Sequence, residues 1–175
     1  MKKIIIMLLS SVYFFFGHYS YAEEKMTQSE LESIFEAMGT NIEGERGAKS
    51  IEFQGVRMIL VSDLIRNRMR LMMPIAKNEE LNKAQIDAAM ISNFHLVLDA
   101  RYAMSNGILY SAYLHPLTEL TKKQLQSAVR QVANLALTFG STFSSGELSY
   151  GVVLVGVNDL FIESTGLCNL SKSYL

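Results

Sequence analysis

The sequence predicts an α+β fold: an antiparallel sheet with helices packed on it, in the order α-β-β-β-α-β-β-α plus a C-terminal tail. Two observations indicate this fold. Helix-capping residues occur at three well separated places, and each opens a stretch with apolar residues spaced three and four apart. Between these stretches, short runs of β-branched and alternating residues are separated by glycine or polar pairs, as in antiparallel strands.

Each predicted helix begins at a capping residue and continues with an apolar stripe. In the first and third helices, a Glu or Gln three residues after the cap completes a capping box. A glycine ends each of these two helices. With their caps, the predicted helices are residues 28–38 after Thr27, 79–92 after Asn78, and 122–139 after Thr121.

Residues 50–75 predict three short antiparallel strands, and the polar residues 41–49 before them predict a loop or a frayed strand. In the third strand, Arg66, Arg68 and Arg70 alternate with other residues, which gives one basic and one apolar face. Such a row is typical of a solvated sheet face. It can also bind an acidic partner or, at an edge, discourage the addition of another strand.

Leu98–Leu114 predicts a β-hairpin that turns on Ser105-Asn106-Gly107. A two-residue loop would mix polar and apolar residues on both faces. A three-residue loop pairs Tyr102 with Tyr110 and separates an apolar face from a mostly polar one. Because a one-residue slip inverts every side chain, we expect the three-residue loop, with the first and third helices covering the face of both tyrosines.

The first 22 residues have the pattern of a secretory signal peptide. Two lysines lead into the apolar run Ile4–Phe16, and small residues precede a cleavage site near Ala22/Glu23. Because the run is short for a membrane-spanning helix, we expect a periplasmic or secreted bacterial protein without membrane contact after cleavage. The alternative is an uncleaved signal that anchors a structural or regulatory domain in the membrane.

Beyond the leader, 153 residues suit one domain with its own core. We expect the folded domain at 23–140 and a C-terminal extension at 141–175, with one added strand possible at Tyr150–Val157. The net charge of −1 becomes −3 without the leader's two lysines, which argues against nucleic acid as a partner. Cys168 is the only cysteine, so no intrachain disulfide can form.

Motifs for catalysis and cofactors are missing from the sequence. It contains no HExxH, CxxC or GxSxG motif, no acidic calcium loop and no phosphate-binding loop. We therefore expect no enzyme activity, no cofactor and no metal. His95 or His115 could meet a carboxylate such as Asp99 or Glu119, so a hydrolase is the less favoured alternative.

Methionine and arginine are the unusual features that remain. Methionine fills irregular cores, which explains most of the methionines here, and it also builds adaptable binding surfaces. A strand that presents arginine and methionine together is therefore our candidate for contacting a partner protein. The candidate partner-binding residues are Arg66, Arg68, Arg70, Met69, Met72 and Met73.

One local pattern carries a family resemblance. Ala100-Arg101-Tyr102 leads into Asn106-Gly107 and Leu114, and the capped stretch Leu120–Leu125 (LTKKQL) follows. This pattern, together with the element order, resembles the YbjN-like domain, a relative of the type III secretion chaperone fold. The resemblance implies an α+β fold, homodimerisation and a non-enzymatic role in binding other proteins, and it carries over no catalytic residues. The signal peptide and the tail depart from the cytosolic members.

These observations favour an exported, non-enzymatic protein-binding or chaperone-like module with an unidentified protein partner and a possible homodimer.

Overall fold

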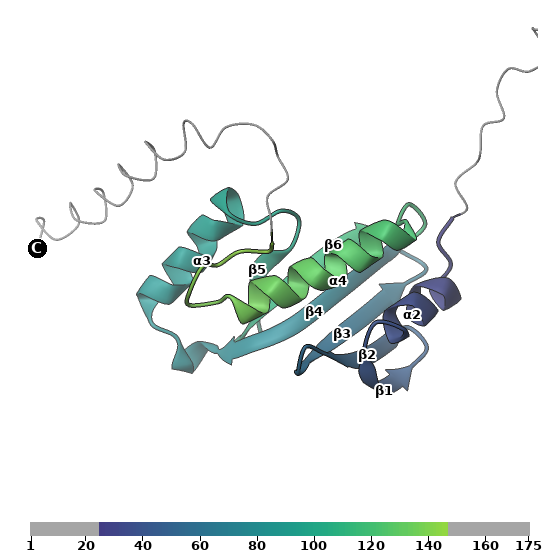
Figure 1. The fold of residues 1–175 in the computed structure, drawn as a ribbon, viewed down its shortest axis with the longest axis horizontal. Helices are drawn as coiled ribbons and strands as arrows, with labels where there is room; N and C mark the ends of the chain where they lie inside the picture. The colour runs from purple at the N-terminus through teal and green to yellow at the C-terminus, as the bar shows by residue number, and fades with distance from the viewer. Residues whose placement is uncertain (1–24, 147–175) are drawn as a thin grey trace, which may run out of the picture.

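The computed structural model describes residues 25–146, so the predicted leader, the added strand at 150–157 and Cys168 lie outside the described residues. The predicted α+β class and element order are confirmed: three helices accompany one antiparallel sheet with the strand order β1-β2-β3-β4-β6-β5 (Figure 1). The elements are α2 (Gln28–Glu36), β1 (Thr40–Glu45), β2 (Ala48–Phe53), β3 (Val56–Asp63), β4 (Arg68–Lys77), the 3-10 helix η1 (Asn78–Glu80), α3 (Lys83–His95), β5 (Arg101–Ser105), β6 (Ile108–Pro116) and α4 (Lys122–Leu137).

The polar segment expected as a loop or frayed strand is β1, which pairs with β2 at the edge of the sheet. Gly39 joins α2 to this hairpin. A Cβ atom at Gly39 would lie 2.6 Å from the Glu52 carbonyl oxygen and 2.8 Å from the Ile51 Cδ1. The close approach of these two elements therefore requires glycine at this position.

The predicted start of the middle helix was wrong. Asn78 begins the 3-10 turn η1, and α3 starts after Asn82, whose side chain accepts a hydrogen bond from Gln85 N at 3.0 Å. The Gln85 side chain in turn accepts from Asn82 N, so a capping box fixes this start. The Asn78 N–H donates instead to the Gly107 carbonyl at 2.7 Å, which ties it to the β5–β6 turn.

The predicted register of the β5–β6 hairpin was also wrong. Ser105 pairs with Ile108 across a two-residue loop, and Tyr102 consequently pairs with Ser111 rather than with Tyr110. The loop residues 106 and 107 have φ angles of 49° and 73°. Two positive φ angles define a type I′ turn, whose twist matches the flanking strands. Segregation of polar from apolar residues misled the prediction because both faces of this sheet carry apolar side chains.

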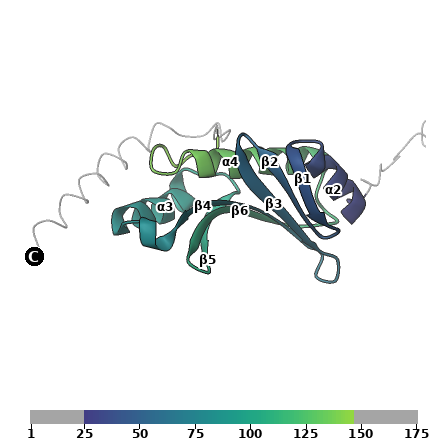
Figure 2. The ribbon, with the colours of Figure 1, turned by 90° about the horizontal axis from the view of Figure 1, so that it is seen from below.

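Helices α2 and α4 cover one face of the sheet, and the core lies between them and the strands (Figure 2). The predicted capping box of α4 is confirmed, since the Thr121 side chain accepts from Gln124 N and the Gln124 side chain accepts from Thr121 N. Tyr102 points into this core and donates its hydroxyl hydrogen to the Leu135 carbonyl at 2.8 Å. Fully buried side chains of the core include Leu31, Phe35, Ile51, Met58, Leu71, Met73, Leu109 and Leu125.

The middle helix, α3, lies beside the edge strand β5 rather than over the sheet (Figure 1). The Asn93 side chain accepts from Tyr102 N at 2.8 Å and donates to the Tyr102 carbonyl at 3.1 Å. The amide of one side chain therefore satisfies both backbone groups that this residue presents at the edge. Within residues 25–146, no helix is long and apolar enough to cross a membrane.

Candidate functional site

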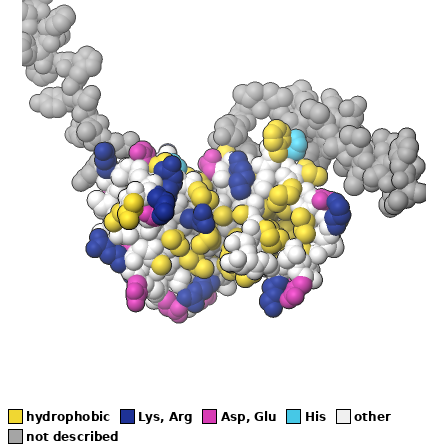
Figure 3. All heavy atoms as spheres, turned by 180° about the vertical axis from the view of Figure 1, so that it is seen from behind, with side chains coloured by type: hydrophobic (Ala, Val, Ile, Leu, Met, Phe, Trp, Pro, Cys, Tyr) yellow, Lys and Arg dark blue, Asp and Glu magenta, His cyan; other side chains and the backbone are white. Residues whose placement is uncertain are grey.

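The face of the sheet opposite α2 and α4 is open: no helix of the described chain packs on it (Figure 2). Because side chains alternate between the two faces of a strand, the neighbours of the core residues point to this side. Apolar side chains gather at the centre of this face, where the surface is hollowed (Figure 3). We refer to it as the open face.

A groove of about 510 Å³ crosses the open face over β4, β6 and β5. The register explains its lining, since Met72 lies opposite Ala112, and Tyr110 lies opposite Ala103. Leu114 is 57% exposed, a large fraction for leucine within a strand. The residues that line the groove are Arg70, Met72, Ala103, Met104, Ser105, Tyr110, Ala112 and Leu114.

The apolar surface continues onto β3. Ile59 pairs with Met72, and Val61 pairs with Arg70, so both β3 side chains extend the lining of the groove. The apolar band therefore crosses four adjacent strands. A band of this kind, bordered by charged residues, is typical of an interaction site.

The arginines of the open face differ in what they bind. Arg57 pairs with Glu43, and Arg101 donates to the carbonyls of the 98–100 segment. Arg68 donates to a neighbouring backbone carbonyl. Arg70 lines the groove and makes no hydrogen bond or ion pair with any of residues 25–146 for which the structure gives contacts. Its guanidinium group is thus available to a carboxylate of a partner.

The structure brings together only some of the predicted partner-binding residues. Arg70 and Met72 line the groove, and Arg68 lies on the same face at the start of β4. Met69 and Met73 are buried in the core on the other face. They support the groove from below and have no exposed surface for a partner.

Arg66 lies in the turn before β4 rather than on the predicted strand. Its Nη1 atom donates to Asp63 Oδ2 at 2.8 Å, and its backbone N–H donates to Asp63 Oδ1 at 2.9 Å. The hydrogen bond from the Arg66 side chain holds the pKa of Asp63 below its usual value. The role of Arg66 in this structure is therefore to close the turn between β3 and β4.

Sequence reasoning missed the contribution of β6 to the groove. Tyr110, Ala112 and Leu114 follow one another at every second position, which is the signal of one strand face. The predicted register assigned that face to the core. Asn106-Gly107 is a strong signal for a type I′ turn. Giving it more weight would have placed these three residues on the face of the sheet away from Tyr102, which is the open face.

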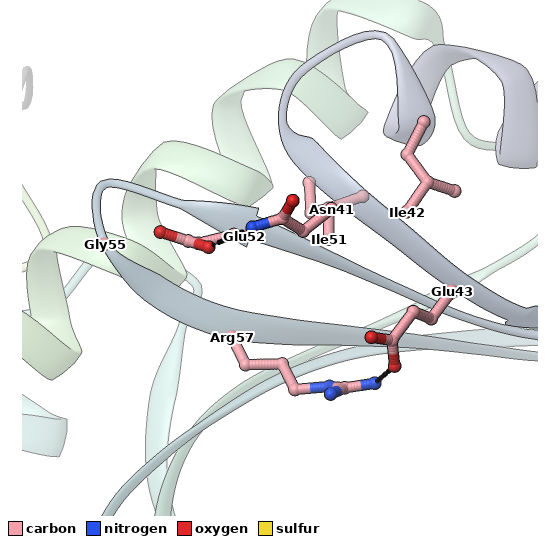
Figure 4. Close-up of a pocket in the computed structure, with 7 residues that line it drawn as sticks. All are labelled: Asn41, Ile42, Glu43, Ile51, Glu52, Gly55 and Arg57. Carbon is pink, nitrogen blue, oxygen red and sulfur yellow. Dashed lines mark hydrogen bonds and ion pairs between the residues drawn. The ribbon is translucent and has the colours of Figure 1, made fainter.

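A second cavity, of about 630 Å³, lies beside the β1–β2 hairpin (Figure 4). The Asn41 side chain donates to Glu52, and Arg57 forms an ion pair with Glu43. Polar groups of this cavity therefore bind one another. Such a site offers a ligand less than the groove does, because binding would have to break these contacts.

A small cavity of about 200 Å³ lies between β6 and α4, and both His115 and Asp99 line it. The hydrogen bonds of His115 and Asp99 do not form a catalytic relay. His115 Nδ1 lies 2.7 Å from the Pro116 carbonyl, whereas Asp99 Oδ2 and Ser127 Oγ both accept hydrogen bonds from Gln131 Nε2. A relay would need a hydrogen bond from the histidine to a nucleophile and to a carboxylate.

The other groups considered for chemistry lie apart from this cavity. His95, at the end of α3, packs edge-on against Phe94 with ring centroids 4.8 Å apart. Glu119 accepts from the Asn67 side chain, which holds its pKa below the usual value. Among the residues that the structure describes, no group of three His, Cys, Asp or Glu side chains could hold a metal ion.

The fold and the groove together define a class: an α+β domain whose antiparallel sheet has one covered face and one open face with an apolar groove. No family model matches the sequence, and no curated protein matches it either.

Three solved structures resemble this chain in fold. The HopA1–SchA chaperone–effector complex is 10% identical over 62% of this chain and 88% of that one, with a TM-score of 0.49. The ExsC–ExsE complex is 17% identical over 53% and 73%, with a TM-score of 0.44. The Yersinia pestis type III secretion chaperone SycH, in complex with a fragment of YscM2, is 17% identical over 65% and 98%, with a TM-score of 0.48.

Proposed function

We propose that this chain is a non-enzymatic, chaperone-like module that binds an apolar segment of a partner protein on its open face. The observation that carries the proposal is the apolar band across four strands, uncovered by any of residues 25–146, with Arg70 available beside it. Burying a large apolar side chain there would contribute roughly 1.5–3 kcal/mol. Several such contacts are needed, because association costs the partner translational and rotational freedom that the buried area must offset.

The mode of binding follows from β5, the edge of the sheet that borders the groove. Strand addition at β5 would need the backbone groups of Tyr102, and the Asn93 side chain already binds both of them. A partner segment would instead lie across the strands and insert apolar side chains beside Met72 and Leu114. A carboxylate on the segment would bind the Arg70 guanidinium, which favours partners whose apolar residues are flanked by Asp or Glu.

The cellular setting belongs to the same proposal. The predicted signal peptide supports export to the periplasm with cleavage near Ala22/Glu23, and the pattern in residues 100–125 supports a relation to the YbjN-like domain and homodimerisation. Mass spectrometry of the N-terminus in the native host checks export, because a mature protein that starts at Glu23 excludes a membrane anchor. Light scattering of the mature protein gives its mass in solution.

The binding proposal is tested with immobilised mature protein and periplasmic extract of the native host. Leu114→Asp places a charge in the groove, and its matched control is Ile65→Asp, since Ile65 is 95% exposed in the β3–β4 turn. We expect a protein captured by the unmodified chain to be retained by Ile65→Asp and lost with Leu114→Asp. Equal capture by both variants would place binding elsewhere on the molecule.

A further inference from the structure

The helix α3 has a second uncovered apolar surface, separate from the groove. Ala89 faces inward and is buried, but Met90, Ile91 and Phe94 are 47%, 57% and 85% exposed. The apolar residues of this helix are not confined to one stripe, so burying Ala89 leaves large apolar side chains exposed. Among residues 25–146, none covers this surface, which we call the outer face of α3.

The described chain ends close to this helix. The Ser145 hydroxyl accepts a hydrogen bond from Leu98 N at 2.8 Å, and the Asn134 side chain donates to the Ser145 carbonyl. Leu98 follows the end of α3 by only three residues. The described chain therefore ends near the C-terminal end of α3, on the helix side of the sheet (Figure 1). The groove opens on the other side.

The sequence that follows has the length and composition to cover the outer face. After Gly146 the chain continues for 29 residues, with apolar runs at Val152–Val155 and Leu160–Ile162. The 13 residues of α3 make a helix about 20 Å long. The eleven residues 152–162, which contain both apolar runs, would reach about 36 Å if extended, so they are long enough to span the helix. Tethering gives such a segment an effective concentration on the order of millimolar, with no partner required.

We propose that residues 150–162 of the same chain pack on the outer face of α3, placing the two apolar runs against Ile91 and Phe94. Two observations favour this occupant over a second copy of the chain. The described chain ends beside one end of the surface to be covered, and the sequence of the segment contains apolar runs that would themselves be buried there. In this arrangement the tail completes the domain and leaves the groove free for a partner.

The proximity of residues 150–162 to α3 is tested in the full mature chain, whose tail carries a single substitution. Cys168→Ser removes the native thiol, and Ile91→Cys carries a benzophenone photo-crosslinker on the outer face. We expect the main crosslinks to join α3 to residues 150–162 within one chain. In a mixture of isotopically light and heavy protein, crosslinks between light and heavy chains would show that a second copy covers α3 and would overturn the proposal. If the crosslinker reached neither residues 150–162 nor a second copy of the chain, the proposal would be overturned as well.

Hydrogen exchange gives an independent test. The double variant Val153→Asp/Val155→Asp is compared with Ser171→Asp/Ser173→Asp, which adds the same charge outside the apolar runs. We expect amides of residues 86–95 to exchange at least tenfold faster in the first variant only, with β4 and β6 unchanged. Equal exchange in the two variants would contradict the proposal. If β4 and β6 also lost protection, the tail would have a role in the main core, and tail cover of α3 alone would be excluded.

Discussion

The two faces of the sheet have similar side chains and different surroundings. On β4, Leu71 and Met73 are buried under α4, whereas Met72, between them, lies on the open face in the groove. On β6, Leu109 is buried and Leu114 is exposed. The comparison teaches that hydrophobicity alone does not identify the core of this fold. What separates the faces is whether a helix covers them, so we assign stability to the covered face and binding to the open one.

The largest expected effect comes from truncating the covered face. Met73→Ala removes a fully buried side chain and leaves a cavity, so we expect a loss of about 2–5 kcal/mol in the free energy of unfolding. The matched change on the open face is Met72→Ala, for which we expect a loss below about 1 kcal/mol. Urea denaturation of both variants measures the difference. Equal losses would contradict the division of the two faces.

Tyrosine offers a second matched pair, with a smaller effect. Tyr102→Phe removes the hydroxyl donor to the Leu135 carbonyl in the core, which costs about 1 kcal/mol. Tyr110→Phe changes a groove residue on the open face, and we expect no change in stability there. Thermal or urea unfolding checks both variants. A larger loss for Tyr110→Phe would show that the open face is covered in solution.

The same tyrosine predicts how stability depends on pH. Burial raises the pKa of Tyr102, and burial together with nearby Asp99 raises the pKa of Tyr113. The folded state holds the hydroxyl protons of the two tyrosines more tightly than the unfolded state does. The contribution of these tyrosines to the free energy of unfolding is therefore complete below about pH 10 and is lost as the pH rises further. Urea midpoints between pH 8 and 11 should fall less steeply for Tyr102→Phe than for the unmodified chain. Parallel curves would contradict the assignment.

The smallest effects on stability are expected from the arginines. Arg66 and its partner Asp63 are exposed, and exposed pairs contribute little, so Arg66→Ala should leave the unfolding midpoint unchanged. Arg70→Ala should also leave it unchanged but weaken capture of the partner, with the loss greatest at low salt. Capture at two salt concentrations separates the variants. Equal weakening by both would remove the special role of Arg70.

Local signals were enough for much of the fold. Thr121 and Gln124 satisfy each other within one helical turn, so a capping box read from the sequence also occurs in the structure. The start of α3 was different, because Asn78 and Asn82 are both good caps, and the prediction did not use Gln85, which completes a capping box with Asn82 only. The Asn78 N–H binds the Gly107 carbonyl, and nothing near Asn78 in the sequence indicates that bond.

The candidate site was less predictable than the fold for a related reason. Arg70 and Met72 were identified from one strand, but the groove needs β6 beside β4 and the β5–β6 register. Neither follows from alternation when both faces of a strand are apolar. The uncovered state of Tyr110 and Leu114 depends on where α2 and α4 pack, which is a property of the whole sheet.

The neighbouring position of β4 and β6 also has a kinetic consequence. The strands β1 to β4 form consecutive hairpins, and β5 and β6 form another, so both halves can assemble through local contacts. The ladder between β4 and β6 joins residues such as Pro74 and Tyr110, which lie far apart in the sequence. Closing that loop is slow, so we expect it to be among the last steps of folding. Because the groove straddles this ladder, a half-folded chain lacks the groove, and the proposed partner binding would report completion of the fold.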